Sequence, residues 1–255
     1  MRLTFIHPAI GHRRGETYLR SWQMEPLPVA ALKGLTPADI ETRFYDDRLE
    51  LIPFDEPADL ISISVETYTA KRAYQIASEY RKRGVPVLMG GFHATLMPEE
   101  VKRFADVIIT GEAESVWETM IDDLRHGTLQ REYHGTQTDL RSIRVDRSLF
   151  AGKRYLPIGL VETGRGCRFH CEFCAVQSFY QQRYRRRDPD HVLRELEGLK
   201  GTKNLFFFVD DNFAGSLRES REFLPALANA GIRWVTQMSI DAAHDEEFVR
   251  ALSQA

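Results

Sequence analysis

The three cysteines of this chain are the residues whose type and spacing are most able to do chemistry. They are Cys167, Cys171 and Cys174, and all of them fall in the stretch GRGCRFHCEFCAV. An odd number of cysteines at such short spacing cannot form a closed disulfide framework. In a reducing compartment, clusters of this kind more often bind metal or do redox chemistry. The sequence therefore predicts a metal or redox site in this loop.

An iron–sulfur cluster and a zinc ion are the two metal groups that such a loop could hold. A 4Fe-4S cluster takes cysteine thiolates, and three from one loop can each hold one iron while the fourth iron keeps an open position. A structural zinc site takes four protein ligands, and His170 is poorly placed to be the fourth because it is adjacent to Cys171. A zinc-stabilised interaction module and a chance cluster of core cysteines stay open as alternatives.

Polar residues also follow two apolar runs in the second half of the chain. Residues 205–209, LFFFV, lead into an Asp-Asp-Asn sequence, and a strand predicted at 234–240 carries polar residues near its end. Parallel α/β sheets bind ligands beyond the carboxyl ends of their strands. Asp-Asp-Asn is equally suited to turns and helix caps. The candidate residues are Asp210, Asp211, Asn212, Gln237 and Ser239.

Three short segments in the first half directly follow predicted strands. They are Val65-Glu66-Thr67-Tyr68, Gly90-Gly91-Phe92-His93 and Gly111-Glu112-Ala113-Glu114. Glycines at these points let the backbone turn sharply and approach a ligand closely. The alternative is that these glycines only make turns between elements.

The elements that must position these segments alternate between short apolar runs and helical stretches, which is typical of βαβ units. Continuous apolar runs such as LISISV predict strands that helices cover on both faces. The pattern predicts a doubly wound, flavodoxin-like α/β domain over residues 1–127. Its expected strands are 3–8, 41–45, 60–65, 85–89 and 107–110, and its expected helices are 26–35, 69–83, 98–104 and 115–126.

The pattern in the remainder of the chain predicts a linker between two domains, followed by a second series of βα units. Residues 128–154 are polar and irregular, which favours a linker on the surface. At roughly 30 residues per βα unit, residues 155–255 hold about three units. Expected strands are 156–162, 205–209 and 234–240, and expected helices are 189–199, 216–230 and 245–253, with Gly231 as a helix stop.

Composition excludes several classes of protein. With 43% hydrophobic and 28% charged residues, the chain is globular rather than disordered or collagen-like. A net charge of -3 gives no electrostatic reason to expect a nucleic acid or an anionic membrane. We interpret the basic run 183–187 as a solvated patch, and the docking of a phosphate-bearing tail or an anionic substrate is the alternative. No apolar run approaches the ~20 residues of a membrane span, and the first residues lack a signal-peptide pattern. We therefore expect a cytoplasmic protein with no integral membrane segment and no nucleic-acid partner.

The cysteine spacing and the first-half segments together resemble a known family. Cys167-x3-Cys171-x2-Cys174, with Phe173 before the last cysteine and a strand before the loop, resembles the signature of the radical S-adenosylmethionine (radical SAM) superfamily. The first half, with GGFHAT and TGEAE after successive strands, is similar to the cobalamin-binding module that precedes the barrel in the B12-dependent class. The resemblance covers residues 1–255. It implies a flavodoxin-like (Rossmann-like) cobalamin-binding domain, followed by the first half of a partial (β/α)6 barrel, truncated after about three units.

The resemblance also implies cofactors, partners and a reaction. A 4Fe-4S cluster would cleave S-adenosylmethionine to a 5'-deoxyadenosyl radical, a flavodoxin- or ferredoxin-type protein would supply electrons, and cobalamin would carry a methyl group. The expected reaction is methylation of an unactivated carbon of a small-molecule substrate. Alternatives are an oxidative cyclase or rearrangement enzyme of the same class and a non-catalytic iron–sulfur or cobalamin-binding fragment. The first half could also hold a flavin.

Family resemblance assigns site residues but no catalytic residue. The expected cluster ligands are Cys167, Cys171 and Cys174, and the expected S-adenosylmethionine-binding residues are Phe173, Asp210, Asp211, Asn212 and Gln237. The expected cobalamin-binding residues are Glu66, Thr67, Tyr68, Gly90, Gly91, Phe92, His93, Gly111 and Glu112. The Asp-x-His-x-x-Gly motif that supplies a cobalt-ligating histidine in some cobalamin domains does not occur after the first strand, where residues 7–15 are HPAIGHRRG. His12 is therefore a less favoured ligand.

Overall fold

The computed structural model describes residues 1–11, 23–141 and 143–255 of the chain. Their contacts divide the chain into two compact units. The first comprises Met1–Asp139 with Ile143–Arg154, and the second comprises Leu140–Ser142 with Tyr155–Ala255.

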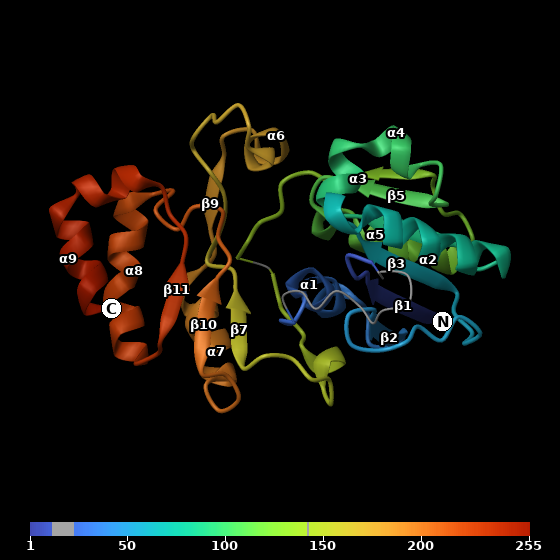
Figure 1. Cartoon of the computed structure of the whole chain (residues 1–255), viewed down its shortest axis with the longest axis horizontal. Helices are drawn as coiled ribbons and strands as arrows, with labels where there is room; N and C mark the ends of the chain where they lie inside the picture. Colours follow the sequence, from blue (N-terminus) through green and yellow to red (C-terminus); the bar gives the residue numbers. More distant parts are fainter. Residues whose placement is uncertain (12–22, 142) are drawn as a thin grey trace. The chain divides into compact units, whose positions relative to one another are not determined.

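A six-stranded parallel sheet in the order β2-β1-β3-β4-β5-β6 forms the centre of the first unit (Figure 1). The order of the first five strands is that of flavodoxin-like folds, which confirms the predicted fold class. The strands are β1 (Arg2–His7), β2 (Glu41–Asp46), β3 (Leu60–Ser64), β4 (Val87–Gly90), β5 (Val107–Thr110) and β6 (Glu132–His134). The helices are α1 (Leu27–Leu35), η1 (Thr67–Thr69), α2 (Ala70–Lys82), α3 (Phe92–Leu96), α4 (Pro98–Val101), η2 (Ala113–Ser115), α5 (Trp117–His126) and η3 (Ser148–Phe150).

Helices cover both faces of this sheet, as the continuous apolar runs predict. Neighbouring residues of a strand point to opposite faces. Ile6 of β1 lies in a core cluster with the buried stripe of α2, which includes Ile76 and Tyr80. Its neighbour Phe5 stacks on Trp117 of α5, with ring centroids 6.0 Å apart. The sheet therefore has a buried layer on each side.

The segment predicted as a linker, 128–154, differs from that expectation. It contains β6, which pairs with β5, and nearly all of the segment packs within the first unit rather than forming a connection. The sequence did not predict this strand, because a segment of three residues, EYH, is too short to show the alternation of polar and apolar residues that is typical of strands. The pairing brings two backbones close together: Gly135 donates its N–H to the Thr110 oxygen at 2.7 Å, and a Cβ on Gly135 would collide with the Glu112 backbone oxygen.

A three-stranded parallel sheet in the order β11-β10-β7 forms the centre of the second unit (Figure 1). A two-stranded antiparallel pair, β8 with β9, lies after β7 in the chain. The strands are β7 (Ile158–Val161), β8 (Gly164–Gly166), β9 (Tyr184–Arg186), β10 (Leu205–Phe208) and β11 (Trp234–Thr236). The helices are α6 (Ala175–Tyr180), α7 (Pro189–Leu199), α8 (Leu217–Ala230), η4 (Ile240–His244) and α9 (Glu246–Gln254).

The helices of this unit begin at the polar residues that the sequence offers as caps. The Asp188 carboxylate accepts hydrogen bonds from backbone N–H groups at the start of α7, and Ser216 and Asp245 cap α8 and α9 in the same way. Gly231 ends α8 in the left-handed conformation, as predicted. The strand expected at 234–240 is shorter, because the chain leaves β11 after Thr236 and turns into η4.

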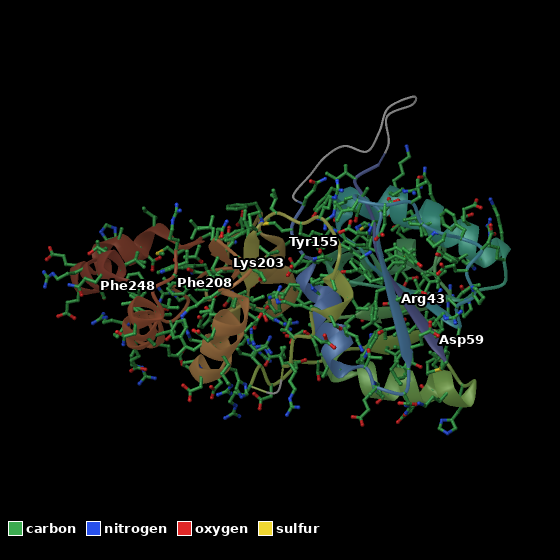
Figure 2. All side chains as sticks on the ribbon, turned by 90° about the horizontal axis from the view of Figure 1, so that it is seen from below. Arg43, Asp59, Tyr155, Lys203, Phe208 and Phe248 are labelled. Carbon is green, nitrogen blue, oxygen red and sulfur yellow. The ribbon has the colours of Figure 1, made fainter. Side chains whose placement is uncertain are left out.

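Aromatic side chains of β10 and its neighbours fill the core of the second unit. Phe206 and Phe208 are buried on one face of β10, and the Phe208 ring lies 5.1 Å from the ring of Trp234. Phe248 of α9 is fully buried in the same cluster; Figure 2 labels it together with Phe208. Each unit thus has its own core. Across the described ranges of the chain, no helix is both long and apolar enough to span a membrane.

Candidate functional site

The three cysteines lie on the loop that runs from β8 to α6. Cys167 and Cys174 are half-buried, Cys171 is exposed, and none of them forms a disulfide. Cys174 donates its backbone N–H to the Cys171 oxygen at 3.0 Å, which makes a tight turn between the last two cysteines. Phe173 is part of this turn and is 92% exposed. The loop thus presents three free thiols and one aromatic ring.

This donor set fits an iron–sulfur cluster better than it fits zinc. Three thiols from one loop are the ligands that a cluster with one open iron position needs. His170 is exposed and precedes Cys171 directly, so it is poorly placed to be a fourth ligand for zinc. Among the residues that the structure describes, no three His, Cys, Asp or Glu side chains form a ready metal site. The fit therefore rests on the chemistry of the three thiols.

Asp210, the first residue of the Asp-Asp-Asn sequence, is bound to the end of β7. It is 1% exposed, and its carboxylate accepts hydrogen bonds from the backbone N–H of Thr163, at 2.6 Å, and from the Thr163 hydroxyl. Burial raises the pKa of Asp210 to about 6. The side chain therefore ties the chain after β10 to the chain after β7.

The next two residues reach the cysteine loop itself. Asp211 accepts a hydrogen bond from the backbone N–H of Gly166 at 2.7 Å, and burial raises the pKa of this carboxyl. The Asn212 amide nitrogen lies 3.6 Å from the Cys167 sulfur, to which it donates. Gly166 has φ +87°, and a Cβ there would collide with the Arg183 backbone oxygen, so this position before Cys167 needs glycine.

Residues after β11 complete the surroundings of the loop. Gln237, which is exposed, donates from its side-chain amide to the Asp210 carbonyl at 3.1 Å. Ser239 donates its backbone N–H to the Asn212 side-chain oxygen at 3.1 Å. Asp241 in η4 forms an ion pair with Arg168 of the cysteine loop. The carboxyl ends of all three strands therefore contribute contacts to this region.

A group of charged residues supports the same region and was missed from the sequence. Arg187 is 4% exposed and donates to the Glu162 carbonyl at 2.9 Å and to the Glu195 carboxylate at 2.8 Å. Arg186 donates to the Ser220 hydroxyl at 2.8 Å and lies over the Phe213 ring. The prediction that the basic run 183–187 is a solvated patch is wrong for these two arginines. Composition alone does not distinguish a solvated arginine from one whose aliphatic part packs on aromatic rings and whose guanidinium group forms hydrogen bonds.

Glu66, Thr67 and Tyr68 follow β3, where the first unit carries its predicted cobalamin residues. Burial raises the pKa of Glu66 to about 7. Tyr68 is 65% exposed. Gly91, after β4, has φ +98°, and a Cβ there would lie 2.9 Å from the Val65 oxygen. The glycine lets the β4 segment approach the β3 segment closely.

The buried His93 ring belongs to a chain of hydrogen bonds. The ring is 4% exposed, with Nδ1 at 3.2 Å from the Thr67 hydroxyl and Nε2 at 3.0 Å from the Tyr74 hydroxyl. Tyr74 in turn donates to the Glu100 carboxylate at 2.9 Å. Both ring nitrogens therefore have partners within the fold, and His93 joins η1, α2 and α4. Gly90 is the last residue of β4, and Phe92 is the first residue of α3.

Gly111 and Glu112 follow β5 and serve the pairing with β6. Gly111 has φ +74°, and a Cβ there would collide with the Gly135 backbone oxygen. The buried Glu112 carboxylate accepts a hydrogen bond from the backbone N–H of Thr138 at 3.1 Å. These contacts give both residues a structural role beside any binding role.

Acidic residues at the end of β2 form a second cluster that was missed from the sequence. Asp46 and Asp47 are fully buried and pair with Arg48 and Arg72, the latter at 2.7 Å. His7 ends β1 beside them, and burial, aided by the Arg48 charge, lowers its pKa to about 4. The cluster fixes the carboxyl ends of β1 and β2. His12 lies outside the described residues.

Comparison with known proteins gives matches to both halves of the chain. A family model described as the B12 binding domain matches residues 32–121. Bacteriochlorophyllide d C-8(2)-methyltransferase of Chlorobaculum tepidum is 30% identical over 250 residues, which covers 90% of this chain and 55% of the relative. Anaerobic magnesium-protoporphyrin IX monomethyl ester cyclase of Cereibacter sphaeroides is 26% identical and covers 100% of this chain and 49% of the relative. The chain thus spans about half the length of these curated relatives.

A solved structure shares the fold. It is the radical S-adenosylmethionine methyltransferase TsrM of Kitasatospora setae, with cobalamin and a [4Fe-4S] cluster bound, and it matches with a TM-score of 0.73 at 15% identity. The match covers 99% of this chain and 57% of that one. A B12-binding domain, relatives that align along both units and this shared fold agree with the cysteine spacing. Residues 32–121 thus match the B12 binding domain, and the chain is similar to methyltransferases and a cyclase along both units and shares its fold with a radical SAM methyltransferase.

Proposed function

We propose that this chain is part of a cobalamin-dependent radical SAM enzyme that methylates an unactivated carbon of a small molecule. The observation that carries the proposal is the loop with Cys167, Cys171 and Cys174, held at the carboxyl ends of β7, β10 and β11 in a chain that also has a B12-binding domain. Methyltransferases among its relatives support the reaction.

The residues of this chain would hold three cofactors. When bound, these supply the chemistry: an electron from the cluster, a 5'-deoxyadenosyl radical from S-adenosylmethionine and a methyl group from cobalamin. We assign the cluster to the three cysteines, and contacts with S-adenosylmethionine to the exposed Phe173 and Gln237. We assign contacts with cobalamin to the loops after β3, β4 and β5, where the exposed ring of Tyr68 lies two residues from Glu66.

Oxidative cyclisation is the second candidate reaction. One observation favours it: the cyclase of Cereibacter sphaeroides aligns with the whole of this chain. The two reactions share the radical-forming step and differ in what happens to the substrate carbon. A flavodoxin- or ferredoxin-type reductant and a cytoplasmic location are parts of the same proposal.

Anaerobic reconstitution tests the proposal. The chain is expressed with cobalamin supplied, reconstituted with iron and sulfide, and reduced with dithionite in the presence of S-adenosylmethionine. We expect corrin absorption, about four irons per chain and 5'-deoxyadenosine, with loss of 5'-deoxyadenosine in Cys171→Ala.

A matched control and the contrary results complete this test. Ser178→Ala, on α6, alters a small polar residue near the loop that has no thiol and should leave iron content unchanged. A colourless protein with one zinc per chain would refute the proposal. A cluster that forms without any cleavage of S-adenosylmethionine would instead favour a non-catalytic fragment.

A further inference from the structure

The Asp-Asp-Asn sequence after β10 makes three successive contacts with the chain that leads into the cysteine loop. Asp210 binds Thr163, Asp211 binds the backbone of Gly166, and Asn212 reaches Cys167. In an extended chain, consecutive side chains alternate in direction, so three contacts with one neighbouring segment are a specific arrangement. Each of these side chains has a hydrogen-bond partner within the protein, unlike a polar side chain whose partner is a bound ligand.

Asn212 is the member of this set whose contact concerns the metal site directly. It is 2% exposed, so its amide group must be paired within the fold. The side-chain oxygen accepts hydrogen bonds from the backbone N–H groups of Ala214, at 3.2 Å, and Ser239, at 3.1 Å. The nitrogen donates to the Ser239 hydroxyl at 3.0 Å and to the Cys167 sulfur at 3.6 Å.

The oxygen contacts fix the orientation of this amide. An inverted amide would place its NH2 group against two backbone N–H donors, which would leave those donors without an acceptor. The nitrogen is therefore aimed at the Cys167 sulfur and cannot exchange places with the oxygen. Hydrogen bonds to the sulfurs of an iron–sulfur cluster are among the features that set its reduction potential. They raise the potential because they stabilise the more negative, reduced state.

We propose that Asn212 is a positioning residue for the cluster, whose amide fixes Cys167 and raises the reduction potential of the bound cluster by donating a hydrogen bond to the cysteine sulfur. The inference rests on the proposed function for the presence of the cluster, and on this chain's own contacts for the role of the residue. It assigns to Asn212 a role toward the cluster in place of the predicted role toward S-adenosylmethionine.

Asn212→Asp tests the proposal because it keeps an oxygen for Ala214 and Ser239 and replaces the donor to sulfur with a carboxylate oxygen. Asn204→Asp is the matched control, since Asn204 is exposed at the opposite end of β10 and the change in charge is the same. After reconstitution, the midpoint potential is measured by a redox titration monitored by electron paramagnetic resonance. We expect a more negative potential in Asn212→Asp at unchanged iron content, and no shift in Asn204→Asp.

A second measurement works on the chain without a cluster. The rate at which iodoacetamide alkylates Cys167, Cys171 and Cys174 is followed by mass spectrometry in each variant. We expect the alkylation rate of Cys167 to change by about threefold or more in Asn212→Asp, because the contact that holds its sulfur is lost. The rates at Cys171 and Cys174 should stay within error of the parent chain.

The outcomes separate this inference from the proposed function. A potential and an alkylation rate that both equal those of Asn204→Asp would overturn the role of Asn212. A selective change at Cys167 in a chain that binds no cluster would refute the proposed function while the contact stands. If Asn212→Asp does not fold, Asn212→Ser replaces it: the hydroxyl can still accept from Ala214 but does not reach the sulfur, and the same two shifts are expected.

Discussion

At the scale of single residues, burial decides which of the predicted polar groups are free to act. Asp210 and His93 lie inside the protein, and their side-chain polar atoms have partners within the fold. Glu66 differs, because burial raises its pKa to about 7. This carboxyl group, which follows a strand of a B12-binding domain, is therefore partly protonated near neutral pH.

Glu66 should make the stability of the chain depend on pH. Its folded pKa of about 7 lies above its ordinary value of 4.5, so the native state binds the proton more tightly. The free energy of unfolding should fall as pH rises from about 4.5 to about 7 and stay level above that. Glu66→Gln should remove this slope and stabilise the chain at pH 8 by roughly 1–3 kcal/mol.

Urea denaturation of the chain without cofactors, from pH 5 to pH 8, measures this effect. Glu118→Gln is the control, because Glu118 is an exposed glutamate on α5 of the same unit. Equal pH profiles for Glu66→Gln and the parent chain would contradict the prediction.

At the scale of elements, close approaches between backbones position the loops that we assign to the cofactors. The loop after β5 can pass the chain after β6 only because Gly111 and Gly135 have no side chains where they meet. The cysteine loop depends in the same way on Gly166. These glycines explain part of the pattern that resembles a cofactor-binding motif, since packing within the fold already requires them.

Gly135→Ala should destabilise the first unit. Its Cβ would collide with the Glu112 backbone oxygen, so β6 must shift away from β5 or break its hydrogen bonds. We expect a loss of about 2 kcal/mol or more, with faster hydrogen exchange at Gly135 and at the backbone amides of β6.

A matched alanine in the second unit should act in the opposite direction. Gly198 lies within α7, and a Cβ at this position would have no heavy atom within 4 Å outside its own stretch of helix. Gly198→Ala should therefore stabilise the chain by about 0.5–1 kcal/mol. Thermal unfolding measures both changes. A neutral Gly135→Ala would show that β6 adapts without cost.

At the scale of the whole molecule, two separate cores support two different sets of proposed cofactor-binding residues. The first core includes Trp117, and the second includes Phe208. Each core underlies one set of loops: those of the first unit carry the assigned cobalamin residues, and those of the second carry the cysteines. Damage to one core should therefore affect one cofactor more than the other.

Two large-to-small substitutions test this separation. Each of Phe208→Ala and Trp117→Ala should cost about 3–5 kcal/mol of core stability in its own unit. After anaerobic reconstitution with cobalamin, Phe208→Ala should lower iron content and keep corrin absorption, and Trp117→Ala should do the reverse. Equal losses of both signals in both variants would show that the two units fold as one.

Helices and strands with a regular spacing of apolar residues, and the cysteine loop, can be recognised from the sequence alone. Apolar runs such as β3 and amphipathic stretches such as α7 form where predicted, because burial on one or both faces leaves a regular pattern in the chain. Three thiols at fixed spacing predict a metal or redox site without reference to a fold, and this stays a prediction. Their surroundings follow from tertiary contacts instead: β6 is too short for a period, and Asp211 and Asn212 bond to residues 45 positions earlier. Such bonds depend on strand pairing, which no local pattern records.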